Sequence, residues 1–272
     1  MPNNKNFFWI VIVFIISALN LYKTGYALAE LDCVIEPHKT VEVSSATTGV
    51  LASVLVDRGE RVKKGQLLAR LQSGVEEASV KLAEIQANSQ VSILEKQARY
   101  ELSQRSQARI EGLSKKNTIS ELERDEARTR TTIAQYELEQ TQVEHQIAQL
   151  ELKRAQEILK LRSILSPVDG IVVERFKLAG EYVEKQPILK LAEVDLLNVE
   201  VVAPVTLFGR IKLGMQAQVI PEEPISGHHI AKVVVVDPIV DAASGTFGIR
   251  LHLPNPGYKI PAGLHCQVQF ME

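Results

Sequence analysis

The sequence predicts an α+β multidomain chain. A β-domain made of two half-motifs is interrupted by a long antiparallel α-helical coiled-coil hairpin and followed by a small barrel or sandwich of strands. Three observations predict this class. The phrase GERVKKGQLL returns as GEYVEKQPIL, residues 75–165 between the two copies favour helix, and strand patterns follow the second copy. The 272 residues, 45% of them hydrophobic and 24% charged, suffice for two or three small domains.

The first 29 residues have the order of a secretory signal. Lys5 precedes an uncharged run at 7–22, and the small-residue tripeptide Ala27-Leu28-Ala29 follows it. The run is shorter than the roughly 20 residues that a membrane-spanning helix needs. We therefore interpret 1–29 as a signal peptide cleaved after Ala29, with an uncleaved N-terminal anchor as the alternative. Either segment exports the rest of the chain from the cytoplasm.

Residues 30–43 form a predicted N-terminal strand that contains Cys33, and Cys266 lies near the other end of the chain. Asp32, directly before Cys33, argues against a lipid-modified cysteine, because small residues precede such cysteines. In an oxidising compartment an even pair of cysteines is more often bridged than free. If the N-terminal strand pairs with the last strand, Cys33 and Cys266 come within bonding reach. We predict this disulfide, with two buried thiols as the alternative.

The repeated phrase belongs to two half-motifs, at 44–74 and 166–195. Each half consists of short strands separated by glycine turns, and matching residues recur at one constant offset. Such a small unit cannot bury an apolar face alone, so the two halves are predicted to pack as one domain. The predicted turn glycines are Gly49, Gly59, Gly65, Gly170 and Gly180.

The insertion at 75–165 contains no proline and one glycine, Gly112. Glu, Gln, Ala, Leu, Lys and Arg dominate it, which is a strongly helical composition. The only break is GLSKKNTIS at 112–120, where Ser120 and Glu123 have the spacing of a capping box. We predict two helices of about 35–45 residues folded as an antiparallel hairpin about 55–65 Å long. A bundle of short helices is the rival interpretation, but it needs turns that this composition does not supply.

The second helix of the hairpin carries an apolar stripe with spacings of three and four residues. This spacing predicts that the stripe is the coiled-coil seam. Its members are Ile133, Tyr136, Val143, Ile147, Leu150, Leu161 and Ile164, and polar residues interrupt it at Gln140, Arg154 and Glu157.

The tail at 196–272 reads as five strands and one short helix at 204–211 with proline at its start. Strands of this spacing are typical of a small barrel or sandwich. The strand at 30–43 adds a sixth member.

Four segments carry a resemblance to a known family: TTGVLASVLVDRGERVKKGQLLARL, SPVDGIVVERFKLAGEYVEKQPILKLAEVD, VTLFGRIKLGMQAQV and VVVVDPIVDAASGTFGIRLHLPNP. They resemble the periplasmic adaptors, or membrane fusion proteins, of the HlyD and RND efflux type. The resemblance implies a lipoyl-like β-domain in the flanks and a β-barrel in the tail. It also implies a homo-oligomeric ring, hexameric by analogy, in the periplasm at the inner membrane. The implied partners are an RND or ABC transporter and a TolC-like outer-membrane channel.

At the hairpin tip, Arg109, Leu113 and Ser120 reproduce the R-x3-L-x6-S spacing with which RND-type adaptors dock onto such a channel. Arg109 can donate forked hydrogen bonds, Leu113 supplies an apolar knob and Ser120 allows close approach. A solvated Arg109 and an N-capping Ser120 are the structural alternative. RND adaptors usually continue into a membrane-proximal domain, which this sequence lacks, so it resembles a short adaptor.

Other classes of function find less support. A carrier domain needs an exposed lysine on the hairpin between its halves, but the helical insertion occupies that position; Lys63, Lys64 and Lys185 are interpreted as solvated turn charges. The six histidines show no metal-ligand spacing, and no catalytic set is recognisable. The net charge of -2 and the absence of basic runs argue against nucleic acid. We therefore predict no enzyme, cofactor or metal. An ABC or type I secretion adaptor and a structural envelope coiled-coil protein remain the alternatives.

Overall fold

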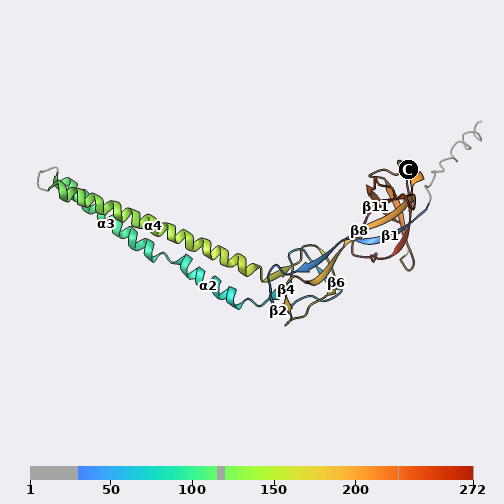
Figure 1. Cartoon of the computed structure of the whole chain (residues 1–272), viewed down its shortest axis with the longest axis horizontal. Coiled ribbons are helices and arrows are strands. Elements are labelled where there is room, and N and C mark those ends of the chain that lie inside the picture. Colours follow the sequence, from blue (N-terminus) through green and yellow to red (C-terminus); the bar gives the residue numbers. More distant parts are fainter. Residues whose placement is uncertain (1–29, 115–119, 226, 272) are drawn as a thin grey trace, which may run out of the picture.

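The computed structural model describes residues 30–114, 120–225 and 227–271. The molecule is elongated, with a helical hairpin at one end, a small β-domain in the middle and a β-barrel at the other end (Figure 1). The predicted signal peptide or anchor at 1–29 and the centre of the hairpin turn at 115–119 lie outside the described residues. The order of the three parts is the one that the sequence predicts.

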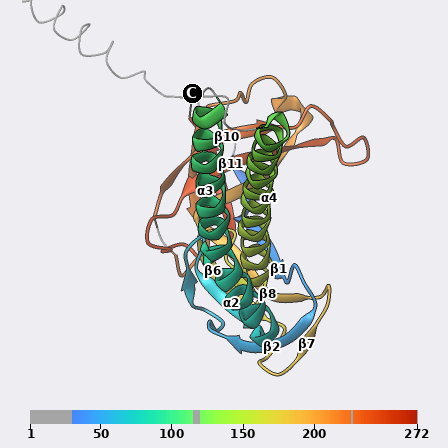
Figure 2. The ribbon, with the colours of Figure 1, turned by 90° about the vertical axis from the view of Figure 1, so that its left-hand side faces the viewer.

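The hairpin consists of a first arm in two pieces and a second arm in one. Its helices are α2 (Gly74–Asn88), α3 (Val91–Ser114) and α4 (Glu121–Lys160). Seen from the tip, α3 and α4 run side by side (Figure 2). The prediction of one unbroken first helix is wrong, because Ser89 adopts an extended conformation with ψ of 116°. Asn88 and Ser89 compete with the backbone for hydrogen bonds, which favours a helix end there.

The predicted coiled-coil seam of α4 is also wrong. The residues of α4 that are buried against the first arm are small: Ala127, Ala134 and Thr141. The first arm supplies the larger half-buried partners Ile93, Tyr100 and Ile110. Two stripes with spacings of three and four residues run along α4, and the prediction chose the more hydrophobic one. That stripe is exposed to solvent, with Ile133, Tyr136, Val143, Ile147 and Leu150 each 53–66% exposed.

The two half-motifs interlock as one domain. The first half supplies β2 (Gly49–Val54), β3 (Arg61–Val62) and β4 (Leu67–Leu71), and the second supplies β6 (Gly170–Arg175), β7 (Tyr182–Val183) and the start of β8 (Pro187–Pro204). β2 pairs with β7, and β3 pairs with β6, so each half completes the other. Their shared core includes the fully buried Leu51, Leu68, Leu71, Ile188 and Leu191. This cross-pairing explains why the phrase occurs twice.

The turn glycines of the repeat have two different physical roles. Gly59, Gly65 and Gly180 have φ values of 81–91°, a conformation that glycine adopts without strain. Gly170 instead lies against the backbone of β8, where a Cβ atom would overlap the carbonyl oxygen of Ala192. Gly49 begins β2 at its pairing with Val183. Matching glycines of the two halves thus occupy the same place in the strand pattern, but the physical reason for glycine can differ between the two halves.

The tail closes into a six-stranded barrel. Its remaining strands are β1 (Leu31–Ser44), β9 (Gln216–Pro221), β10 (His229–Val236), β11 (Thr246–Pro254) and β12 (His265–Phe270). The order β1-β12-β9-β10-β11-β8 is completed by pairing of β1 with β8. Cys33 of β1 and Cys266 of β12 are direct cross-strand partners and are joined by a disulfide. The short helix predicted at 204–211 is only a 3-10 turn, Val205–Leu207.

Two long strands join the barrel to the middle domain. β1 and β8 pair over both domains, with a register shift between Pro37 and Lys39. β8 crosses the predicted boundary between residues 195 and 196 without interruption. The two β-units are therefore connected by a continuous two-stranded ribbon rather than by a loop.

Candidate functional site

The base of the hairpin is fixed by Arg162, the second residue after α4. Its guanidinium contacts the Glu76 carboxylate on α2 at 2.6 Å and donates to the Thr48 carbonyl at 2.9 Å. The backbone carbonyl of Arg162 accepts from the Leu71 amide at 2.8 Å. One residue thus joins the first turn of α2, the end of α4 and the first half-motif. The short strand β5 (Ser163–Leu165) then pairs with β4.

Glu76 is held in its charged form at this base. A hydrogen bond from its own backbone amide lowers the pKa of Glu76 below the ordinary 4.5, and the Arg162 guanidinium adds to this effect. Both side chains are mostly shielded, with 21% of Arg162 and 15% of Glu76 exposed. The hairpin therefore leaves the β-domain in a defined direction.

The tip of the hairpin is held by a helix cap. Ser120 Oγ accepts from the Glu123 amide at 3.2 Å, and the Ser120 amide donates to Glu123 Oε2 at 3.3 Å. This is the capping box that the spacing of these two residues predicts. The polar groups of Ser120 are therefore engaged in starting α4.

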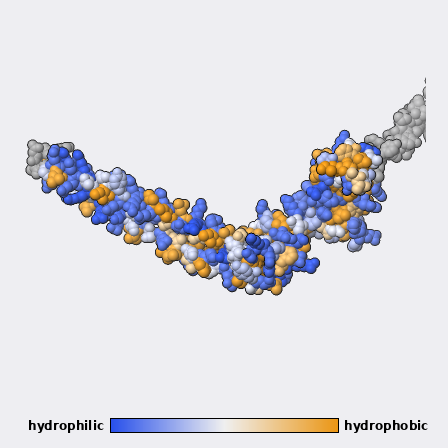
Figure 3. All heavy atoms as spheres, in the orientation of Figure 1, coloured by the Kyte–Doolittle hydropathy of each residue, from blue (hydrophilic) through white to orange (hydrophobic). Residues whose placement is uncertain are grey.

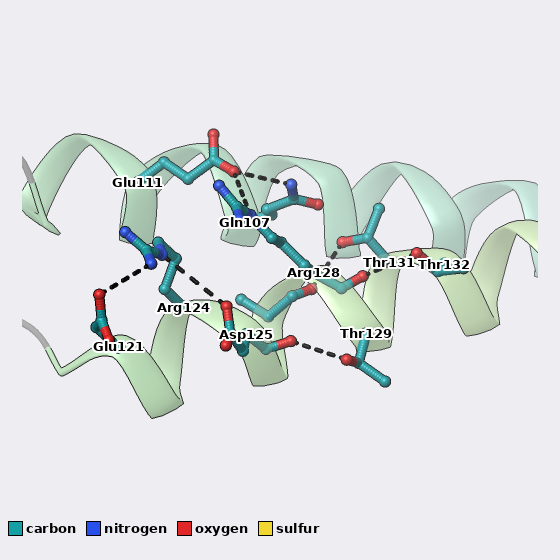
Figure 4. A network of polar contacts seen from close by, with 10 residues as sticks. Gln107, Glu111, Glu121, Arg124, Asp125, Arg128, Thr129, Thr131 and Thr132 are labelled. Carbon is teal, nitrogen blue, oxygen red and sulfur yellow. Dashed lines mark hydrogen bonds and ion pairs between the residues drawn. The ribbon is translucent and has the colours of Figure 1, made fainter.

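Polar contacts join the two arms behind the tip (Figure 4). Arg128 of α4 contacts Glu111 of α3 at 3.4 Å, and Arg124 lies between Glu121 and Asp125. Further from the tip, Glu137 of α4 contacts both Lys96 and Arg99 of α3 at 3.2 Å.

The contacts of Glu137 with the other arm lower the pKa of its carboxyl group. A hydrogen bond from Lys96, with the charges of Lys96 and Arg99, lowers the pKa of Glu137. Such exposed ion pairs stabilise weakly, but they fix which residues of the two arms lie level with each other.

Arg109 and Leu113 lie together on one side of the tip. Both line a groove of about 670 Å³ between α3 and α4. Leu113 is 47% exposed, and within the described part of the chain no hydrogen bond or ion pair engages the Arg109 side chain. Ser120 does not line this groove. The structure thus brings two of the three predicted docking residues together and gives the third a capping role.

The groove contains residues that the sequence analysis missed. Leu102, Ser106, Arg109 and Leu113 are spaced by four, three and four residues along α3, so they share one helix face. Ile133 and Arg130 of α4 form the opposite wall. The spacing within α3 could have revealed this face, but the pairing with α4 could not be predicted once the wrong seam was chosen.

The search for a metal site is confined to residues 30–114, 120–225 and 227–271. These residues contain no group of three or more His, Cys, Asp or Glu side chains that could hold a metal ion. His38 and His252 lie edge to face with ring centroids 5.1 Å apart, and His38 Nδ1 is 3.2 Å from Asn198 Oδ1. Burial, with the positive charge of neighbouring groups, lowers the pKa of His252. Lys63, Lys64 and Lys185 are exposed.

None of the helices in the described ranges is long and apolar enough to cross a membrane.

The architecture has known relatives. A family model for the CzcB-like, barrel-sandwich hybrid domain matches residues 39–193, which include both half-motifs and the hairpin. The fold is similar to that of MacA from Actinobacillus actinomycetemcomitans, with a TM-score of 0.76 and 20% identity, over 92% of this chain and 80% of that chain. It is also similar to the membrane fusion protein Spr0693 from Streptococcus pneumoniae R6, with a TM-score of 0.63 and 13% identity, over 90% and 99%.

One curated relative is an uncharacterized protein of Haemophilus influenzae. It is 21% identical over 237 residues, which are 86% of this chain and 55% of the relative. The chain therefore spans about half the length of this relative.

Proposed function

This chain belongs to the family of CzcB-like barrel-sandwich hybrid proteins, the periplasmic adaptors, and we propose that it is the adaptor subunit of a tripartite efflux pump. In this proposal it bridges an inner-membrane transporter, with the RND type favoured, to a TolC-like outer-membrane channel. It works in the periplasm at the inner membrane after export by its N-terminal segment. It has no catalytic role, and the transporter supplies the energy.

The observation that carries the proposal is the contrast between the clamped base and the open tip of the hairpin. Arg162 fixes the base to a buried β-core, whereas the tip presents Arg109 and Leu113 in an open groove. A helical arm with a fixed origin and an available end suits a spacer between two membranes. α4 alone, with 40 residues, is about 60 Å long.

At the tip, we assign docking onto the channel to Arg109 and Leu113. A guanidinium can donate up to five hydrogen bonds to carbonyl groups at the ends of channel helices. Leu113 adds a compact apolar contact beside it. Ser120 supports this surface indirectly, because its cap fixes the first turn of α4.

The other end of the molecule suits the transporter. The barrel end opposite the β-domain exposes Phe208, Leu213 and Ile239, with 49%, 68% and 79% of each residue accessible. The Cys33–Cys266 disulfide lies in the same barrel and is consistent with an oxidising compartment. The tip spacing favours an RND partner, and an ABC-type or type I secretion exporter is the alternative.

A cysteine at Leu113, in the otherwise native chain, tests the proposal in intact cells of the source organism. Cross-linking from Leu113→Cys should capture an outer-membrane channel, identified by mass spectrometry. Lys81→Cys, exposed near the base, is the matched control and should not capture it. A parallel probe at Ile239→Cys should capture the transporter and thereby name its class. A folded, exported Leu113→Cys chain that captures no channel would refute the docking role and leave a structural coiled-coil protein as the better account.

A further inference from the structure

The ribbon of β1 and β8 is irregular where it passes from the middle domain into the barrel. Between Pro37 and Lys39, β1 has one residue, whereas β8 has three residues between their partners Leu197 and Glu193. The extra residues form a bulge, which bends a strand and interrupts its ladder of hydrogen bonds. The bulge lies between the two cores, because Leu191 belongs to the core of the middle domain and Leu197 to that of the barrel. It is therefore the point at which the ribbon can flex.

Asn255, the residue after β11, supplies hydrogen bonds that β1 does not give to this bulge. Its backbone amide donates to the Asp195 carbonyl at 2.7 Å, and its Nδ2 donates to the Val194 carbonyl at 2.8 Å. Asn255 is only 1% exposed. Because buried polar groups need such partners, these bonds tie the chain after β11 to the bulge.

The same side chain shapes the loop 255–260, here named the joint loop. Asn255 Oδ1 accepts from the Ile260 amide at 2.9 Å, and Nδ2 also donates to the Ile260 carbonyl at 2.8 Å. Ile260 is buried in the barrel core, and the Tyr258 amide donates to the Asn255 carbonyl at 3.0 Å. Both ends of the joint loop are thus fixed to the barrel, and Tyr258 lies between them.

Tyr258 is held in an unfavourable backbone conformation. Its φ of 62° lies in the left-handed region, which is rare for a bulky side chain, and no other non-glycine residue of the described ranges has a positive φ. Such a conformation persists only where surrounding contacts impose it. The hydrogen bonds of Asn255 on both sides of Tyr258 provide those contacts.

The joint loop meets the middle domain at Arg61. The guanidinium carbon of Arg61 lies 4.4 Å from the centroid of the Tyr258 ring, and Nη2 donates to the Gly257 carbonyl at 3.3 Å. One flat guanidinium thus stacks on the ring and bonds the backbone of the same loop. Ile171, the cross-strand partner of Arg61, packs against the barrel core. The strands β3 and β6 therefore form an edge of the middle domain that faces the barrel.

We propose that Arg61 and Tyr258 form a latch that sets the angle between the barrel and the middle domain. With the latch closed, the molecule is bent, and the middle domain lies at the bend between the hairpin and the barrel (Figure 3). With the latch open, the ribbon flexes at its bulge and the barrel changes direction relative to the hairpin. The latch lies within one chain, so it does not depend on the proposed function.

The contact has the strength of a reversible latch. Arg61 is exposed, and a cation–π contact at an exposed site changes an equilibrium by about two- to fivefold. Because the bulge itself allows more than one angle, a bias of this size gives a closed majority and an open minority.

Distances between two spin labels across the joint test the latch in the full chain. Ala52→Cys on β2 and Lys232→Cys on β10 place one label in each β-unit, both at exposed positions. Pulsed electron paramagnetic resonance measures the distribution of distances between the labels. The native joint should give one main distance. Arg61→Ala should reduce the ratio of this population to the others by about two- to fivefold and broaden the distribution.

Tyr258→Gly separates the latch from the backbone strain. Glycine adopts a φ of 62° without strain, so the joint loop keeps its shape but loses the ring. The latch predicts the same broadening as in Arg61→Ala. The double variant should be no broader than either single variant, because both changes remove one contact. Tyr258→Phe keeps the ring and should keep the native distribution.

Lys259→Ala is the matched control, because Lys259 is the exposed neighbour of Tyr258 in the joint loop. It should leave the distribution unchanged. A second pair of labels within the barrel, at Lys232→Cys and Gln267→Cys, should respond to none of the variants and so reports that the barrel remains folded.

Three results would overturn the inference. The first is a native distance distribution that neither Arg61→Ala nor Tyr258→Gly changes. The second is equal broadening by Lys259→Ala, and the third is a native joint that is already as broad as the variants. Capture of a channel from Leu113→Cys is independent of all three, so failure of the latch and failure of the proposed function are distinguishable.

Discussion

The base and the tip of the hairpin are built on opposite principles. At the base, Arg162 and a core that includes the fully buried Leu68 and Leu191 hold the helices to the β-domain. At the tip, the helices rest on a serine cap and an exposed ion pair between Glu111 and Arg128. Because buried contacts hold the base and only exposed contacts hold the tip, substitutions at the base should affect folding. Substitutions at the tip should instead affect binding.

The largest effect on stability is expected from Leu191→Ala in the β-core. Leu191 is 0% exposed, and truncating such a leucine costs about 2–5 kcal/mol of unfolding free energy. Urea denaturation followed by circular dichroism measures the change. Leu150→Ala, on the exposed face of α4, is the matched control, because truncation of an exposed leucine should change the unfolding free energy by about 0.5 kcal/mol or less. Equal losses in both variants would contradict the contrast between base and hairpin surface.

Arg162→Ala should have an intermediate effect, because it leaves the Glu76 carboxylate without its partner. We expect a loss of about 1–2 kcal/mol, together with faster amide exchange in the first turn of α2. The lowered pKa of Glu76 also sets the pH dependence. The stabilisation is complete above the ordinary pKa of 4.5 and disappears as the pH falls through the lowered folded-state pKa. Arg162→Ala should therefore lose less stability on acidification than the native chain, and an identical acid profile would argue against the clamp.

Ser120→Ala should have the smallest effect on unfolding. Loss of the cap costs about 1 kcal/mol locally, which should fray the first turn of α4 without changing the β-core. Hydrogen exchange resolved by mass spectrometry should show faster exchange near 121–124 and unchanged exchange in β4 and β8. Ser120→Asp, which can also cap, should restore protection. Unchanged exchange at 121–124 in Ser120→Ala would show that the cap does not hold the tip.

The β-regions could be predicted from sequence more fully than the hairpin. The repeated phrase indicated two interlocking halves, because only a partner half can bury Leu51 and Val183. The pairing of the first and last strands was only the condition for a predicted Cys33–Cys266 disulfide, and the structure contains both the pairing and the bond. The hairpin seam could not be chosen in this way, since two stripes of α4 have the same spacing and hydrophobicity alone favours the exposed one. The helix break at Ser89 depended on weak local preferences.

The proposed docking surface could be predicted only in part, because spacing along one helix does not show how two helices pack. Arg109 and Leu113 share a helix face by spacing alone, but the groove that they line also needs a wall from α4, which the wrong choice of seam left unpredicted. Ser120 fits both a docking motif and a capping box, and only the contacts with Glu123 show which geometry it adopts.

The central claim is that the tip acts by binding and not by stabilising the fold. Its most direct test is the Leu113→Glu variant in cells whose own copy of the gene has been deleted. Efflux is measured as the resistance of these cells to inhibitors to which the deletion makes them sensitive. The account predicts unchanged unfolding free energy, normal accumulation in the periplasm and loss of resistance. Lys153→Glu, on the polar side near the base, should retain it. A stable Leu113→Glu chain that restores full resistance would contradict the account.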